Sequence, residues 1–128
     1  MNRIVLDASA ILAVLNREAG GDKLTPQLLS TTSSSTVNLA EVQSKLVKRG
    51  LEPDDAWEAV LSPIREAVAF TAEHARTAGS LIPQTQALGL SLGDRACLAL
   101  GLALGAPVYT ADRSWKTLKL GVRIHVIR

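Results

Sequence analysis

Four acidic residues stand at positions where a carboxylate could do chemistry, namely Asp7, Glu41, Asp94 and Asp112. Asp7 and Asp112 follow apolar runs and precede helical patterns, where a carboxylate can also cap the free N–H groups of a helix. Glu41 and Asp94 each stand three residues after an asparagine or a serine, which is the spacing of a capping box. Taken one at a time, each acid therefore has a structural explanation.

Taken together, the four acids predict a metal site. In a parallel sheet, the carboxyl ends of the strands and the N-termini of the following helices lie along one edge. Carboxylates gathered there would repel one another unless a cation neutralised them. An all-oxygen ligand set without Cys or His is the set that Mg²⁺ or Mn²⁺ prefers. Such an ion lowers the pKa of its water and polarises a phosphate, which is the chemistry of phosphodiester hydrolysis.

Each acid has an expected role in this site, and all four are expected to be catalytic and metal-ligating. Asp7 follows the predicted central strand and is the first choice for a direct ligand. Asp94 and Asp112 would complete the ligand shell. Glu41 is the candidate for holding or deprotonating the attacking water.

Four further side chains are candidates for contacting the substrate. Ser9 and Thr110 flank the predicted site and could hydrogen-bond a carboxylate or a phosphate, although a helix-cap or turn role explains either equally well. Arg95 and Arg113 each follow a proposed ligand and could hold the phosphates of a substrate. The alternative for both arginines is a solvated surface charge.

Strands alternate with helices along the chain, and this order predicts a mainly parallel sheet with helices on both faces. Strands are expected at residues 3–7, 30–36, 67–70, 107–110 and 122–127. Helices are expected at residues 10–20, 22–29, 38–49, 53–64, 71–81, 83–89 and 92–104. We therefore expect one domain over residues 1–128, folded as a three-layer α/β/α sandwich around a sheet of four to five strands.

Composition excludes several classes of protein. The single cysteine excludes a disulfide framework and a Cys-rich zinc site, so a reducing cytoplasm is the expected compartment. No apolar stretch reaches the roughly 20 residues of a membrane helix, and no membrane association is expected. The net charge is +2, and gathering four of the 12 acids in one pocket would leave the remaining surface more basic. Such a surface favours a polyanionic partner.

Other notable side chains are expected to be structural. Cys97 lies on the apolar stripe of its helix and is expected to be buried. Trp57 is expected in the core, and Trp115 is expected to pack the last short helix. His74 and His125 are expected on surface elements, which argues against metal-independent acid–base cleavage of RNA.

Four segments, at residues 5–10, 37–42, 90–99 and 109–115, resemble the PIN-domain ribonucleases in order and spacing, and among these the VapC-type toxins of bacterial toxin–antitoxin pairs. The resemblance implies an α/β/α fold, Mg²⁺- or Mn²⁺-dependent endoribonuclease activity and a homodimer. It also implies a small antitoxin whose C-terminal segment lies over the acidic site. The family's acids fall on Asp7, Glu41, Asp94 and Asp112. Many relatives carry a further acid where this chain has Ser114, so a second metal is expected to bind weakly or only with RNA phosphates.

Two other functions remain open at this point. A catalytically silent module would keep the fold in order to bind RNA or a protein, but all four acids are retained here. An aspartyl-phosphate phosphatase would use Asp7 as its nucleophile. Such phosphatases usually carry a second aspartate two residues later, where this chain has Ser9.

Overall fold

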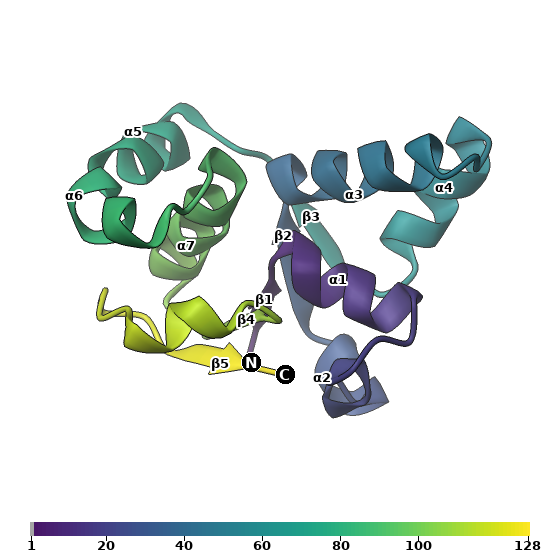
Figure 1. Ribbon diagram of the computed structural model, residues 1–128, viewed down its shortest axis with the longest axis horizontal. Helices are drawn as coiled ribbons and strands as arrows, with labels where there is room; N and C mark the ends of the chain where they lie inside the picture. The colour runs from purple at the N-terminus through teal and green to yellow at the C-terminus, as the bar shows by residue number, and fades with distance from the viewer. Residues whose placement is uncertain (1) are drawn as a thin grey trace.

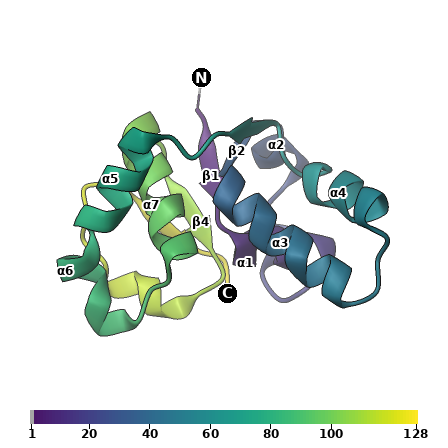
Figure 2. The ribbon, with the colours of Figure 1, turned by 90° about the horizontal axis from the view of Figure 1, so that it is seen from above.

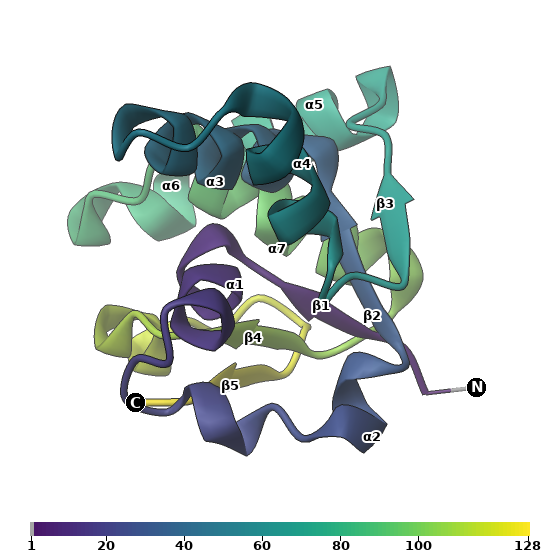
Figure 3. The ribbon, with the colours of Figure 1, turned by 90° about the vertical axis from the view of Figure 1, so that its right-hand side faces the viewer.

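The computed structural model describes residues 2–128 and contains one sheet with the strand order β3-β2-β1-β4-β5. All four strand pairings are parallel, and Figure 3 shows the strands crossing the molecule in this order. The strands are β1 (Ile4–Leu6), β2 (Thr32–Ser35), β3 (Glu66–Val68), β4 (Val108–Thr110) and β5 (Ile124–Val126). The predicted parallel sheet is confirmed, and β1 is its central strand.

Helices cover both faces of the sheet. They are α1 (Ala8–Leu15), α2 (Pro26–Leu29), α3 (Thr36–Lys48), α4 (Pro53–Leu61), α5 (Ala72–Ser80), α6 (Ile82–Thr85) and α7 (Leu92–Leu104), with short 3-10 helices η1 (Gly21–Lys23), η2 (Gln86–Leu88) and η3 (Arg113–Thr117). Figures 1 and 2 show α1 to α4 on one side of the strands and α5 to α7 on the other. The three-layer α/β/α prediction is therefore confirmed.

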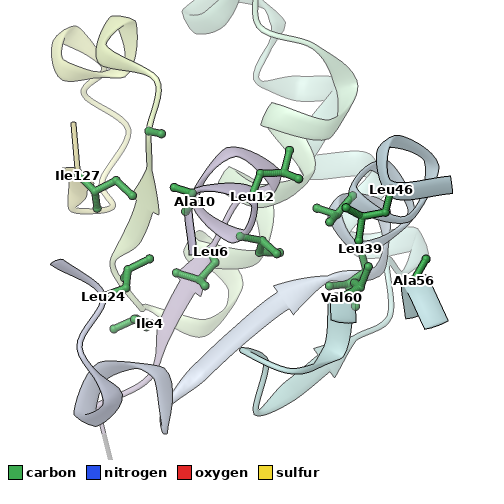
Figure 4. Packing of buried hydrophobic residues seen from close by; sticks show 14 residues of the cluster. Ile4, Leu6, Ala10, Leu12, Leu24, Leu39, Leu46, Ala56, Val60 and Ile127 are labelled. Carbon is green, nitrogen blue, oxygen red and sulfur yellow. The ribbon is translucent and has the colours of Figure 1, made fainter. Parts of the chain in front are cut away.

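Successive side chains of β1 point to opposite faces of the sheet, and this divides the core into two clusters. Ile4 and Leu6 pack with apolar side chains of α1, α3 and α4, as Figure 4 shows. Val5 points to the opposite face, where it packs with Leu98 of α7 and the buried Trp115 of η3. Burying both faces of a short central strand fixes its register, because a slip of one residue would exchange the two faces.

The second strand is unusual because its four residues are polar and fully buried. Its hydroxyl groups find partners: Thr32 donates to the Pro63 carbonyl at 2.7 Å, and Ser34 donates to the Leu6 carbonyl at 2.9 Å. Ser35 accepts from the Val37 N–H and caps α3. Satisfied hydroxyls remove most of the cost of burying a polar strand, so this Ser/Thr segment is a strand and not a linker.

Some predictions need correction. Trp57 was expected in the core but is 41% exposed, because α4 turns Ala56 and Val60 inward and leaves Trp57 at its edge. The first helix ends at Leu15, before the predicted stop, and the following turn brings Gly21 against the Ala13 carbonyl, where a β-carbon would not fit. Strand β3 begins and ends earlier than predicted.

Other expectations agree with the structure. Cys97 and Trp115 are buried, and α7 has the predicted bounds. His125 is exposed on the edge strand β5, where its ring stacks on Tyr109 at a centroid distance of 4.6 Å. Within residues 2–128, no helix has the length and apolar character that crossing a bilayer requires.

Candidate active site

Asp7 occupies the point where the central strand passes into α1. Its backbone is extended, and its Oδ1 accepts from the Ala10 N–H at 2.8 Å, so it caps the helix as an N-cap aspartate. Ser9 also donates to Oδ1, at 2.8 Å, and Thr110 donates to Oδ2 at 2.6 Å. The side chain is only 3% exposed. Asp7 is therefore a buried carboxylate held by three donors.

Burial controls the acidity of Asp7. Desolvation raises its pKa from the ordinary value of 3.8 to about 6. The hydrogen bonds from Thr110, Ala10 and Ser9 oppose this rise, and the negative charge of Asp94 adds to it. A buried anion with an incompletely compensated desolvation cost is a group that a bound cation would stabilise.

Ser9 and Thr110 connect Asp7 to the end of β4. Their hydroxyl oxygens lie 3.2 Å apart. Ser9 Oγ accepts from the Ala111 N–H at 2.9 Å, and Thr110 Oγ1 accepts from the Asp112 N–H at 3.1 Å. Both hydroxyls therefore bond a carboxylate and also hold the backbone where Asp112 begins.

Glu41 lies on α3 and faces the first turn of α7. Its Oε1 accepts from Asn38 Nδ2 at 2.9 Å, and the same nitrogen donates to the Gly93 carbonyl at 3.0 Å. The N-cap of α3 is Ser35, so Asn38 and Glu41 do not form the capping box that their spacing suggested. Glu41 is instead held by a contact between two helices.

Asp94 does form a capping box. Its Oδ2 accepts from the Ser91 N–H at 2.9 Å, and its own N–H donates to Ser91 Oγ at 3.2 Å. The structural explanation is therefore correct for Asp94, as it is for Asp7. Because the charge of Asp94 also acts on Asp7, capping and membership of an acidic cluster are compatible.

The pKa of the Cys97 thiol responds to three of the four acids. This pKa is raised well above the ordinary value, first by complete burial and then by the negative charges of Asp7, Asp94 and Glu41. These three acids come from β1, α7 and α3, and they act electrostatically on the same thiol. We call Asp7, Glu41 and Asp94 the inner acids.

Asp112 lies at the margin of the inner acids. It is exposed, caps η3, and its Oδ1 accepts from both the N–H and the hydroxyl of Ser114, at 2.9 and 2.8 Å. Its charge is not among those that act on Asp7 or Cys97. It is joined to Asp7 through Thr110.

The two candidate arginines behave differently. Arg95 Nη1 donates to the Ala78 carbonyl of α5 at 2.9 Å, so its guanidinium is occupied by helix packing. Arg113 lines a hollow of about 570 Å³ together with Ser9, Asp112 and Arg128. Only Arg113 is therefore placed beside an acid of the site.

Sequence reasoning missed two residues of this region. Asn38 was considered only as a possible cap, because its bond to Gly93 spans two distant segments and leaves no local pattern. Arg128 reaches the hollow because the chain end is held by bonds to Glu18 and to the Ala19 carbonyl. The run of basic residues after Asp112 was the available signal for Arg128.

The donor set fits a hard divalent cation, but the ligand shell is not closed. Within residues 2–128, no three His, Cys, Asp or Glu side chains are placed to hold a common metal ion. Asp7, Asp94 and Asp112 each turn a carboxylate oxygen toward the backbone of the helix that they cap, and Glu41 turns one toward Asn38. Within the described part of the chain, Glu41 Oε2, Asp94 Oδ1 and Asp112 Oδ2 accept no hydrogen bond from the protein. One oxygen of each of these three acids is thus without a protein donor, whereas both oxygens of Asp7 accept hydrogen bonds.

The parallel sheet, the helices on both of its faces and the acids that follow β1 and β4 define an α/β domain. The PIN domain family matches residues 4–119, and the chain belongs to this family. No curated protein matches the chain in sequence.

Solved structures with the same fold include several toxin–antitoxin complexes. The DNA-bound VapBC of Salmonella typhimurium is similar at a TM-score of 0.75 and 18% identity, over 100% of both chains. VapBC2 of Rickettsia felis, bound to a promoter DNA fragment, is similar at a TM-score of 0.73 and 19% identity, over 98% of both chains. VapC20 of Mycobacterium tuberculosis, described as a toxin that cleaves the sarcin-ricin loop, is similar at a TM-score of 0.70 and 21% identity, over 94% of this chain and 98% of that chain. At these identities the likeness establishes the fold.

Proposed function

We propose that this chain is a divalent-metal-dependent endoribonuclease and the toxin of a toxin–antitoxin pair. The observation that supports the proposal is that the charges of Asp7, Glu41 and Asp94, which come from three separate elements, all act on the buried Cys97 thiol and raise its pKa. Helix capping alone does not require three charges to act on one thiol, because each cap acts only on its own helix. Membership of the PIN domain family supports the same function, since PIN nucleases generally use a divalent metal.

The proposed metal is Mg²⁺ or Mn²⁺, and Asp7, Asp94, Asp112 and Glu41 would hold it. When bound, the ion supplies an activated water and charge neutralisation at the phosphate. Asp7 contributes a buried carboxylate that Ser9 and Thr110 orient. Glu41 is half-buried and is the proposed acceptor of the proton from the attacking water.

The proposed substrate is RNA, and the proposed protein partner is a small antitoxin that covers the acidic site. Arg113 lines the hollow beside Asp112 and would attract phosphates, whereas the guanidinium of Arg128, which lines the same hollow, is paired with Glu18. Structures of similar fold are complexes of toxins with antitoxins, which supports the partner. We further propose a homodimer that acts in the cytoplasm, with residues 1–128 forming one nuclease domain.

The capping bonds support a second candidate, a PIN-like module that binds RNA without cleaving it. Asp7, Asp94 and Asp112 each cap a helix, and no three acids within the described part of the chain hold a common ion as placed. In this alternative the acids serve only folding, and the protein has no RNA cleavage for their loss to affect.

Cleavage of a structured RNA with and without divalent cations separates the two candidates. We expect cleavage with Mg²⁺ or Mn²⁺, none with a chelator, and recovery when Mn²⁺ is restored. Asp94→Asn should lose most of this activity while its melting temperature in metal-free buffer stays equal or rises, because repulsion from Asp7 is removed. RNA binding without cleavage under either ion would support the binding module. A marked drop in the melting temperature of Asp94→Asn together with unchanged cleavage would assign Asp94 to capping alone.

A further inference from the structure

The side chain of Asn38 joins two helices at the acidic site. It is 1% exposed, and its Nδ2 donates to Glu41 Oε1 at 2.9 Å and to the Gly93 carbonyl at 3.0 Å. Both partners are acceptors only, so the amide nitrogen and not the amide oxygen must face them. One buried amide thus ties α3 to the first turn of α7.

Gly93 completes this contact. The Glu41 carboxylate occupies the space where a β-carbon at residue 93 would stand. Gly93 therefore accepts the Asn38 bond and leaves room for the carboxylate that the same Asn38 holds. The next residue is Asp94, so this contact holds the Glu41 carboxylate against the turn of α7 that carries Asp94.

Glu41 and Asp94 carry like charges and both act on Cys97. Two neighbouring carboxylates repel, and a half-buried glutamate without a donor would turn toward solvent. A hydrogen bond to a carboxylate is among the stronger bonds available to an amide, and it opposes this movement. No second bond to the Glu41 carboxylate is present within residues 2–128, so its orientation depends on Asn38.

We propose that Asn38 is a positioning residue that holds the Glu41 carboxylate against Gly93, in the first turn of α7 that also carries Asp94, so that Glu41 and Asp94 can serve the same divalent cation. Asn38 acts through Glu41 and does not contact the substrate. The effect of Asn38 on catalysis rests on the proposed nuclease function. The bond between Asn38 and Glu41 is independent of that function, so the bond and the catalytic effect can be tested separately.

The first experiment observes the Asn38 amide in the metal-free protein by NMR. Its two side-chain protons should be protected from exchange with solvent, because both are buried in hydrogen bonds. Glu41→Gln should shift the signal of one proton, and Gly93→Ala should shift both. Rapid exchange typical of an exposed asparagine, or signals indifferent to Glu41→Gln, would overturn the positioning contact.

The second experiment measures Mn²⁺ binding by calorimetry for Asn38→Ala, Gly93→Ala and the double variant. Asn38→Ala removes the donor, whereas Gly93→Ala pushes away the flexible end of Glu41 without requiring backbone movement. Each should weaken Mn²⁺ binding by about 10- to 100-fold, the usual loss for residues that orient a ligand. The double variant should bind Mn²⁺ only slightly more weakly than either single variant, because all three variants disturb the same Glu41 carboxylate.

Gln43→Ala is the matched control. Gln43 lies on the same helix, and its Nε2 donates to the Pro53 carbonyl at 3.0 Å. Its Oε1 is buried and, like Oδ1 of Asn38, has no hydrogen-bond partner within residues 2–128. It therefore loses an equivalent bond between helices without touching the inner acids. We expect this variant to lose stability as Asn38→Ala does but to bind Mn²⁺ as the wild type does.

Kinetics provide the third measurement. Asn38→Ala should lower kcat for RNA cleavage with KM for RNA nearly unchanged, and excess Mn²⁺ should restore most of kcat. Because Mn²⁺ binding also stabilises the folded protein, a purely structural loss would appear as the same lowered kcat in Gln43→Ala. If Asn38→Ala binds Mn²⁺ as the wild type does, the positioning role is overturned alone. If the wild type neither binds Mn²⁺ nor cleaves RNA, the proposed function fails, and the NMR signals still decide whether Asn38 holds Glu41.

Discussion

Asp7 and Asp112 stand in the same local pattern but differ in their place in the sheet. Each follows an apolar strand, caps the next helix and accepts a hydrogen bond at 2.8 Å from a serine two residues later. Asp7 ends the central strand and is buried, whereas Asp112 follows β4 and is exposed. Local sequence therefore fixes the cap and the serine bond, and strand order fixes the desolvation.

This difference separates two contributions to a metal site. Asp7 carries the cost of burial, and its raised pKa reflects that cost. Asp112 gains little from losing its charge, because water already solvates it. Asp7 should therefore contribute more than Asp112 to the free energy of cation binding. Substitution of Asp7 should accordingly cost more activity than substitution of Asp112.

The largest expected difference is in catalysis. Asp7→Asn keeps a capping side chain but removes an anionic ligand, and we expect it to lower kcat for Mn²⁺-dependent RNA cleavage on the order of 10³-fold. Asp112→Asn should lower kcat only on the order of tenfold, because a water can replace an exposed ligand of a Mg²⁺-like ion. Equal losses in steady-state cleavage of a structured RNA would contradict this ranking.

The next difference is in the pH dependence of stability without metal. Asp7 releases its proton near pH 3.8 when unfolded and near 6 when folded, so between these values the folded state binds more protons. The contribution of Asp7 to the free energy of unfolding should therefore fall by about 3 kcal/mol as the pH rises through this window. Urea denaturation of wild type and Asp7→Asn, in a chelator from pH 4 to pH 7.5, measures it as the difference between the two proteins.

Asp7→Asn should accordingly become more stable than the wild type as the pH rises above 4, with most of the gain reached by pH 7. Asp112→Asn provides the comparison, and its difference from the wild type should stay within about 0.5 kcal/mol because the residue is exposed. A difference for Asp7→Asn that does not vary with pH would mean that Asp7 is not desolvated in solution.

The parts of the fold that follow from local chemistry could be predicted from the sequence. Pro53 starts α4 because a proline fits the first turn of a helix, and Gly105 ends α7 in a left-handed conformation. The exposure of Trp57 could not be predicted, because the residues that α4 turns inward depend on where α1 and α3 lie. The early end of α1 similarly depends on the close approach of Gly21 to Ala13.

The candidate site divides in the same way. Asp7, Asp94 and Asp112 could be selected from sequence because each follows a strand or begins a helix, and parallel topology brings such positions to one edge. Glu41 was selected on a capping-box spacing that α3 does not use, because its N-cap is Ser35. The direction of Arg95 could not be predicted, because it depends on the packing of α5 against α7. The role of Asn38 was missed for the same reason, since its partner Gly93 is distant in sequence.

The smallest expected difference separates the two serines of the repeated pattern. Ser9→Ala removes a donor to buried Asp7 and the only acceptor of the Ala111 N–H within residues 2–128, which should lower the free energy of unfolding by about 1 to 3 kcal/mol. Ser114→Ala should cost about 0.5 kcal/mol or less, because water can replace its hydroxyl beside exposed Asp112. Because the Ser9 bond lowers the pKa of Asp7, Ser9→Ala should raise that pKa further. The pH window over which the protein loses stability should then extend to a higher pH. Urea denaturation across pH measures both effects, and equal costs for the two serines would show that the sheet position of Asp7 does not strengthen its hydrogen bonds.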